Sequence, residues 1–261
     1  MYKGKDIGII KISDLRIFNY IFMSGHSKWA KLKHSKGALD AKRGVMFTKL
    51  GNVITIATRE GGGDSDSNFK LRLAIENAKK ANLPKDNIER AIKRGIGDLT
   101  EGQIEEVIYE AFGPNKTSFV IETLTDNKNR TVANLRRIFS KHGGSLAGQN
   151  SVCWMFKKKG IIRIITDDLK KQEKIELKAI DLNAEDIKTE GDELAIYTKL
   201  EELEKIKKGL EDQGVKIDYA QVEWFAKDLI KIDQKTQEKI NAIFLELDDN
   251  TDINDYYTNI E

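Results

Sequence analysis

The fold class is decided by residues 104–125, IEEVIYEAFGPNKTSFVIETLT. Residues 104–112 and 117–125 are rich in β-branched and aromatic side chains, which predicts two strands. Gly113-Pro114-Asn115 lies between them and favours a tight turn, so the two strands form a hairpin. A helix is predicted next, over residues 131–142. Strands and a helix therefore belong to one structural unit.

The same order of strand, strand and helix recurs along the rest of the chain. The predicted elements are strands at 152–156 and 161–165, a helix at 170–182, strands near 187 and at 194–197, a helix at 200–213, a strand at 215–224 and a helix at 234–247. Hairpins that alternate with helices favour antiparallel sheets covered on one face. We therefore predict an α+β protein built from small layers of sheet and helix, rather than a doubly wound sheet.

The residues before this region follow the period of helices instead. Leu50, Val53, Ile54 and Ala57 recur at the spacing of one buried helix face, and the spacing repeats after residue 70. Each such helix buries a single stripe, so the helices must pack on one another as a bundle. The predicted helices cover 35–44, 47–59, 68–81 and the segment from Pro84 to Gly95, where proline suits a first turn and glycine a last one.

Charge divides the chain into two unlike ends. Residues 23–100 hold 16 Lys and Arg against 8 Asp and Glu, a net charge of +8, whereas residues 161–261 hold 15 against 26, a net charge of −11. Such asymmetry indicates a polyanionic partner for the basic part. The acidic part would repel that partner and so help to orient it.

Composition points to a globular protein of a reducing compartment. The chain is 39% hydrophobic and 33% charged, and no apolar run approaches the ~20 residues that a membrane span requires. A single cysteine, Cys153, excludes an internal disulfide. Residues 1–22 resemble neither a signal peptide nor a transit segment, so we expect an extension ahead of a natural start at Met23. The expected location is cytoplasmic, without a membrane partner.

The sequence contains no recognisable motif for a metal site, a cofactor site or a catalytic centre. His26, His34 and His142 have no ligand spacing, which predicts no metal site. The acidic stretch at 64–68 starts like a calcium loop, but Phe69 replaces the required glycine, so a loop with a helix cap is the better interpretation. We predict no cofactor, no catalytic residue and no enzymatic activity. An enzyme would require a cleft with strongly perturbed carboxylates.

The clearest functional signal is the basic string GHSKWAKLKHSK, residues 25–36. Lysines on flexible stems bind phosphates, and a tryptophan offers a face on which an unpaired base can stack. The alternative is a solvated face with Trp29 in the core. A second, weaker basic patch follows Pro84, where Glu89 could instead pair with Lys93. The predicted nucleic-acid-binding residues are Lys28, Trp29, Lys31, Lys33, His34, Lys36, Lys42, Arg43, Lys49, Arg59, Arg90, Lys93 and Arg94.

At these residues the sequence closely resembles the YebC family of probable transcriptional regulators, which includes the mitochondrial translational activator of cytochrome oxidase subunit one. The resemblance runs from Met23 to about residue 250. Several independent strings occur in the family's order. They are 25–29, Lys42-Arg43-Gly44, 47–50, 61–64, 84–86, 88–95, Tyr109-Glu110, Gly113-Pro114, Asn129-Arg130-Thr131 and 143–146.

The resemblance implies an N-terminal helical domain and two α+β domains, the last inserted into the second. The predicted segments are an extension at 1–22, a basic helical domain at 23–100, an α+β domain at 101–130 with 206–250, an inserted α+β domain at 131–205, and an acidic tail at 251–261. The implied function is DNA binding by a transcriptional regulator. The alternative is a translation factor associated with the ribosome or messenger RNA. The oligomeric state stays open.

Overall fold

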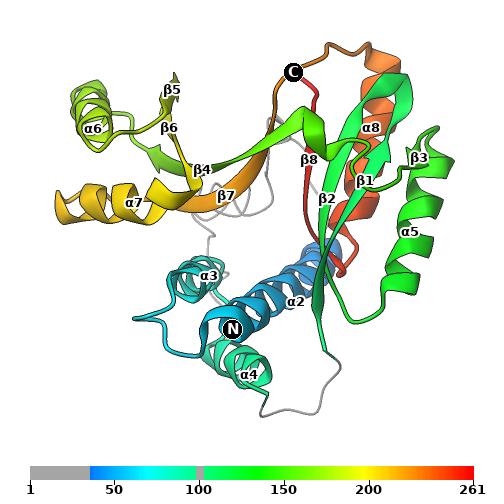
Figure 1. The fold of residues 1–261 in the computed structure, drawn as a ribbon, viewed down its shortest axis with the longest axis horizontal. Coiled ribbons are helices and arrows are strands. Elements are labelled where there is room, and N and C mark those ends of the chain that lie inside the picture. Colours follow the sequence, from blue (N-terminus) through cyan, green and yellow to red (C-terminus); the bar gives the residue numbers. More distant parts are fainter. Residues whose placement is uncertain (1–35, 98–102) are drawn as a thin grey trace, which may run out of the picture.

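The computed structural model describes residues 36–97 and 103–261, with side chains from residue 42 onward in the first helix. Helices α2 (Lys36–Gly61), α3 (Phe69–Lys80) and α4 (Lys85–Gly95) form the N-terminal part. Figure 1 shows this part below two separate sheets, each with its own helices. No helix in the described ranges combines the length and the apolar character that a membrane span needs.

The three N-terminal helices share one core, as the helical spacing predicts. The buried side chains come from all three helices and from the connection between α3 and α4, and are Ile54, Ala57, Leu71, Ala74, Ala78, Leu83, Ile88 and Ala91. Asn68 caps α3 by accepting the N–H of Leu71 at 3.0 Å, which confirms the cap predicted for this loop. The predicted division of the first helix near residue 45 is wrong. Helix α2 is continuous, because buried Met46 anchors the stretch after Gly44.

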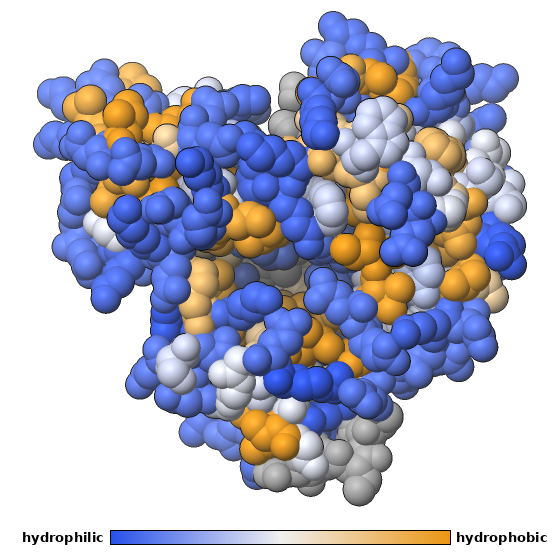
Figure 2. All heavy atoms as spheres, in the orientation of Figure 1, coloured by the Kyte–Doolittle hydropathy of each residue, from blue (hydrophilic) through white to orange (hydrophobic). Residues whose placement is uncertain are grey.

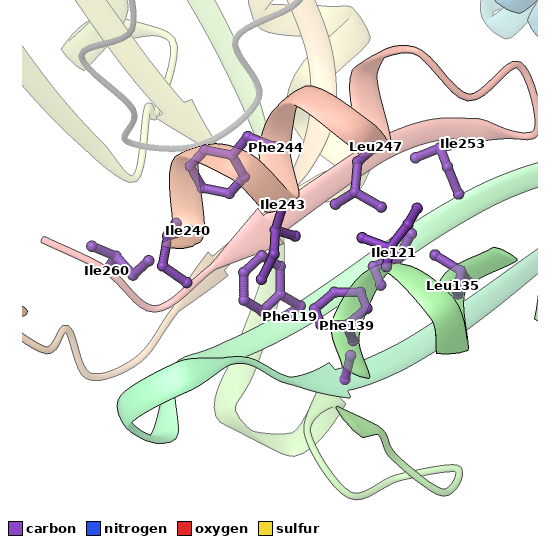
Figure 3. Packing of buried hydrophobic residues seen from close by; sticks show 12 residues of the cluster. Phe119, Ile121, Leu135, Phe139, Ile240, Ile243, Phe244, Leu247, Ile253 and Ile260 are labelled. Carbon is purple, nitrogen blue, oxygen red and sulfur yellow. The ribbon is translucent and has the colours of Figure 1, made fainter. Parts of the chain in front are cut away.

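The first sheet has the strand order β3-β1-β2-β8. Its antiparallel strands are β3 (Ser145–Leu146), β1 (Glu105–Phe112), β2 (Ser118–Thr125) and β8 (Ile253–Thr258), and helices α5 (Lys128–Lys141) and α8 (Gln234–Asp248) cover one face. The predicted hairpin is confirmed, with the short turn η1 (Pro114–Lys116) between β1 and β2. Figure 3 shows Phe119 packed against Phe139, their ring centroids 5.0 Å apart, beside side chains of α8.

The second sheet has the order β5-β6-β4-β7 and is also antiparallel. Its strands are β4 (Phe156–Ile165), β5 (Asp186–Glu190), β6 (Glu193–Thr198) and β7 (Tyr219–Ala226), and its helices are α6 (Leu169–Asp181) and α7 (Leu203–Asp212). The short turns η2 (Cys153–Met155) and η3 (Leu200–Glu202) precede β4 and α7. The predicted strands at 152–156 and 161–165 are one turn and one long strand. The α+β class with an inserted last part is confirmed.

The limits of the inserted part differ from the predicted ones. Helix α5 packs on the first sheet, so the insertion starts after β3 rather than at residue 131. Helix α7 and β7 pack within the second sheet's layer, so residues 206–226 belong to the insertion. The predicted acidic tail is strand β8, an edge strand paired with β2. Periodicity identifies an element, but it does not tell which sheet the element joins.

Gly95 is required where α4 crosses α2. A Cβ atom there would lie 2.5 Å from Thr58 Cβ and 2.7 Å from the carbonyl oxygen of Thr55. We expect Gly95→Ala to lower the free energy of unfolding by about 1–3 kcal/mol, because backbone in the neighbouring helix cannot move aside easily. The thermal unfolding midpoint measures this loss.

Gly51→Ala is the matched control, since Gly51 lies within helix α2 as Gly95 lies within α4, and a Cβ there meets nothing within 4 Å. That change should be neutral or stabilise by up to about 1 kcal/mol, because alanine has the higher helix propensity. Equal midpoints for the two variants would contradict the close approach of α4 to α2.

Candidate nucleic-acid interface

Exposed cations on α4 form the better-defined part of the predicted interface. Ile88 and Ala91 of this helix are buried in the core, whereas Arg90 and Lys93 are exposed. Neither cation pairs with a carboxylate in the part of the chain that the structure describes, while Glu89 pairs with Lys85 at 3.4 Å. The alternative considered for this patch, a pair between Glu89 and Lys93, therefore does not form in the described residues. Two cations of this helix remain available to an external anion.

Arg94 belongs to the same helix but is half-buried. It offers a ligand less surface than Arg90 does. On α2, Arg43 is exposed with its guanidinium 5.1 Å from the centre of the Phe47 ring, and Lys42 is half-buried. Stacking on an aromatic face leaves the edge of a guanidinium free to bind phosphate.

Helix α4 contacts α2 at Thr55, whose hydroxyl donates to the Ala91 carbonyl at 3.1 Å. Arg43 lies twelve residues before Thr55, which corresponds to roughly 18 Å of helix. A ligand that contacts both basic groups has to extend over this distance. A nucleic-acid backbone does so, because a duplex carries one charge per ~1.7 Å of its axis.

Lys49 is not part of this surface, so its prediction as a phosphate contact is wrong. It is 8% exposed, and its Nζ donates to the Asp248 carbonyl at 3.0 Å. Burial lowers the pKa of Lys49, while the charges of Asp248, Asp255 and Asp249 partly oppose that shift. The residue joins α2 to the end of α8. Burial of the long side chain holds the helical part against the first sheet's layer.

Arg59 also has a structural contact. Although the residue is exposed, its Nη1 donates to the Ile104 carbonyl, just before β1. This contact ties the end of α2 to the start of the first sheet. The prediction of Arg59 as a nucleic-acid contact is therefore corrected in part, since one arm of its guanidinium is already bound.

The remaining predicted residues lie outside the described side chains. Lys28, Trp29, Lys31, Lys33 and His34 precede the described residues. Lys36 starts α2, but its side chain is not described. Their role in binding stays a prediction from sequence.

The cations of α3 bind α7 and the segment between α7 and β7. Arg72 pairs with Glu204 at 2.8 Å, and Lys80 Nζ donates to the carbonyls of Ile217 and Asp218 at 3.1 and 2.8 Å. In the reverse direction, Lys207 of α7 pairs with Glu76 at 3.1 Å. Charge counting missed this use of basic residues, because it sums charges without regard to where they point.

A cleft of about 80 Å³ opens where α2, α3, β7 and β8 meet. Figure 2 shows hydrophobic residues gathered around a hollow near the middle of this face. The polar lining includes Lys49, Asn77, Tyr219, Gln221, Asp248 and Asp255. Residues from all three parts of the chain therefore line this cleft.

Carboxylates with raised pKa values lie beside this cleft. Burial raises the pKa of Asp255 well above its usual range, and the charges of Glu122 and Glu223 raise it further. Burial likewise raises the pKa of Glu223, whose oxygens contact Tyr219 Oη at 2.9 Å and Arg163 Nη2 at 3.2 Å. Both oxygens of Glu223 are thus bound within the fold. No set of three or more His, Cys, Asp or Glu suited to a metal occurs in the described residues.

Models of known protein families match most of this chain. A family model described as "TACO1/YebC second and third domain" matches residues 104–260, and one described as "TACO1/YebC protein N-terminal domain" matches residues 27–98. A "probable transcriptional regulatory protein" of Thermoanaerobacter pseudethanolicus is 46% identical over 239 residues, which are 92% of this chain and 97% of that protein. One from Thermotoga maritima is also 46% identical over 239 residues, 92% of this chain and 94% of its own length.

A solved structure shares the fold. The crystal structure of a conserved hypothetical protein from Aquifex aeolicus matches with a TM-score of 0.80 at 42% sequence identity. The match covers 90% of this chain and 97% of that chain. The arrangement of a helical part with two sheet parts is therefore shared with that protein along nearly its whole length.

Asp255 should make stability depend on pH. A carboxyl whose pKa is raised by folding keeps its proton where the unfolded chain releases it, so stability falls as pH rises from about 4 toward the raised value. Asp255→Asn removes the free-energy cost of burying a carboxyl group that the unfolded chain would ionise. We expect the variant to be more stable than the unmodified protein by about 1 kcal/mol or more near pH 8, with a smaller difference near pH 4.

Thermal unfolding at both pH values tests this expectation. Asp228→Asn, at an exposed loop position, is the control and should change the midpoint little at either pH. A loss of stability in Asp255→Asn near pH 8 would show instead that Asp255 is ionised and paired with Lys49.

Proposed function

The chain belongs to the TACO1/YebC family, and from this premise we propose that it is a regulatory protein that binds nucleic acid through its basic N-terminal helices. The observation that carries the proposal is the exposure of Arg90 and Lys93 without carboxylate partners in the described ranges. Arg43 adds a third exposed cation on the same layer of helices. Unneutralised cations on one layer favour binding of phosphates.

DNA is the nucleic acid we propose first. The names of the related proteins from Thermoanaerobacter pseudethanolicus and Thermotoga maritima support transcriptional regulation, which acts on duplex DNA. The acidic second half supports a fixed orientation on such a ligand, since it is repelled by phosphates. Binding would take place in the cytoplasm, and the regulatory role requires no catalytic residue.

Ribosomal or messenger RNA is the alternative ligand. The same cations would bind RNA, because phosphate contacts carry no information about the sugar or the bases. The resemblance to a mitochondrial translational activator supports this alternative. Direct comparison of a DNA duplex with an RNA of the same sequence distinguishes the two ligands.

Neutralising the exposed cations of α4 tests the proposal. Each lost phosphate contact lowers the slope of log affinity against log salt by about 0.9. We therefore expect the double variant Arg90→Gln with Lys93→Gln to bind a labelled duplex more weakly, with a slope lower by about 2. Fluorescence anisotropy across a range of salt concentrations measures both quantities.

The matched control is Lys235→Gln with Lys239→Gln, two exposed lysines four residues apart on α8. It removes the same charge from another part of the molecule and should leave the slope near that of the unmodified protein. Equal slopes for both double variants would remove α4 from the interface.

A further inference from the structure

The large exposed area of Trp154 is not explained by its hydrogen bonding. The residue lies in turn η2, immediately before β4, and is 62% exposed. Its indole Nε1 already donates to the Ser151 carbonyl at 3.0 Å. The polar end of the ring is thus bound within the fold, and the exposed area belongs to its aromatic surface. Tryptophans are rarely left so open unless they contact something.

The turn that carries Trp154 is held in place by a buried carboxylate. Glu110, in the middle of β1, is 4% exposed, and its carboxylate accepts the backbone N–H groups of Asn150 at 2.6 Å and of Val152 and Cys153 at 2.5 and 2.8 Å. Burial opposes ionisation of Glu110, but these N–H groups together hold its pKa below the usual range. The turn is therefore bound by a buried charge.

Hydrophobic contacts fix the chain just before and just after Trp154. Val152 is fully buried beside Val120, Phe156 and Tyr257. Figure 1 shows that the chain from β3 to β4 links the two sheets here. An aromatic face that is already ordered loses little conformational entropy when a ligand stacks on it.

The groups around Trp154 are polar and partly cationic. Lys227 Nζ donates to the Trp154 carbonyl at 2.6 Å, and the backbone N–H of Lys227 donates to the Met155 carbonyl at 2.9 Å. This exposed ammonium is thereby held at the turn. Asn150 is exposed just before the turn, and Asp228, next to Lys227, is also exposed. An aromatic face beside an ammonium group is the combination that binds a base and its phosphate.

We propose that Trp154 is a stacking platform for an unpaired base of single-stranded nucleic acid, with Lys227 contacting an adjacent phosphate. The proposal rests on the nucleic-acid-binding function proposed above and adds a second contact, on the connection between the two sheets. A protein partner would favour an apolar surround, whereas an exposed lysine is bound to the Trp154 backbone and exposed Asn150 precedes the turn.

A labelled single-stranded oligothymidylate of about 12 nucleotides and a duplex of the same length serve as probes. Stacking of one base on an aromatic side chain contributes roughly 5- to 150-fold in affinity. We expect Trp154→Ala to weaken single-strand binding within this range, while Trp154→Phe keeps most of the affinity. Duplex binding should stay the same in both variants, because paired bases do not stack on an external ring.

Leu200→Ala is the matched control, because Leu200 is an exposed apolar residue, 45% exposed, in turn η3 of the same inserted part. It should leave both affinities unchanged. The proposal is overturned by single-strand affinity in Trp154→Ala within about twofold of the unmodified protein, by an equal loss on duplex, or by absence of single-strand binding in the unmodified protein.

The α4 variant separates this proposal from the function on which it rests. If Arg90→Gln with Lys93→Gln leaves all binding unchanged while Trp154→Ala weakens single-strand binding, the proposed N-terminal interface fails and the stacking platform stands. If the α4 variant weakens duplex binding while Trp154→Ala has no effect, the platform fails and the N-terminal interface stands.

Discussion

Arg130 and Asp252 join the start of α5 to the segment that enters β8 through two hydrogen bonds, of 3.0 and 2.6 Å. Asp252 is buried, and it also accepts the Thr131 hydroxyl at 2.9 Å. Bidentate pairs of this kind fix orientation as well as distance. Because the inserted sheet separates these residues in the chain, this contact closes the first sheet after the insertion and holds β8 beside β2.

The position of β8 then determines what surrounds the central cleft. Asp255 of β8 faces the cleft, and Asp248 lies at the end of α8, just before the turn into β8. Lys49 reaches the Asp248 carbonyl from α2, so the helical part is docked on groups that the closed sheet provides. The buried carboxylates beside the cleft are a cost of this docking, since burial disfavours their ionised forms.

Docking also divides the basic residues of the N-terminal helices into two groups. Arg72, Lys80 and Lys49 bind α7, the segment before β7 and α8, where they hold the three parts together. Arg90 and Lys93 lie on α4, and their side chains are exposed to solvent. Net charge alone therefore overstates the interface. Among these N-terminal cations, the ones best placed to meet a polyanion are the exposed ones that no carboxylate or backbone carbonyl has bound.

Local sequence was sufficient for most of the secondary structure. The hairpin across Gly113, the cap at Asn68 and the helical spacing of Leu71 and Ala74 follow from interactions between residues close in the chain, which the sequence displays directly. The sequence also indicated the basic character of the N-terminal part and the family to which the chain belongs.

Tertiary structure alone decided which sheet each element joins and which charged side chains are free. Lys49 and Lys93 look alike in the sequence, yet one is buried against Asp248 and the other is exposed. Trp154 stands in the segment predicted as a strand at 152–156, but this segment forms a turn bonded to Glu110, forty residues and more away in the chain, and the Trp154 ring is exposed. Burial and pairing arise from contacts between distant segments, and these contacts leave no periodic trace in the sequence.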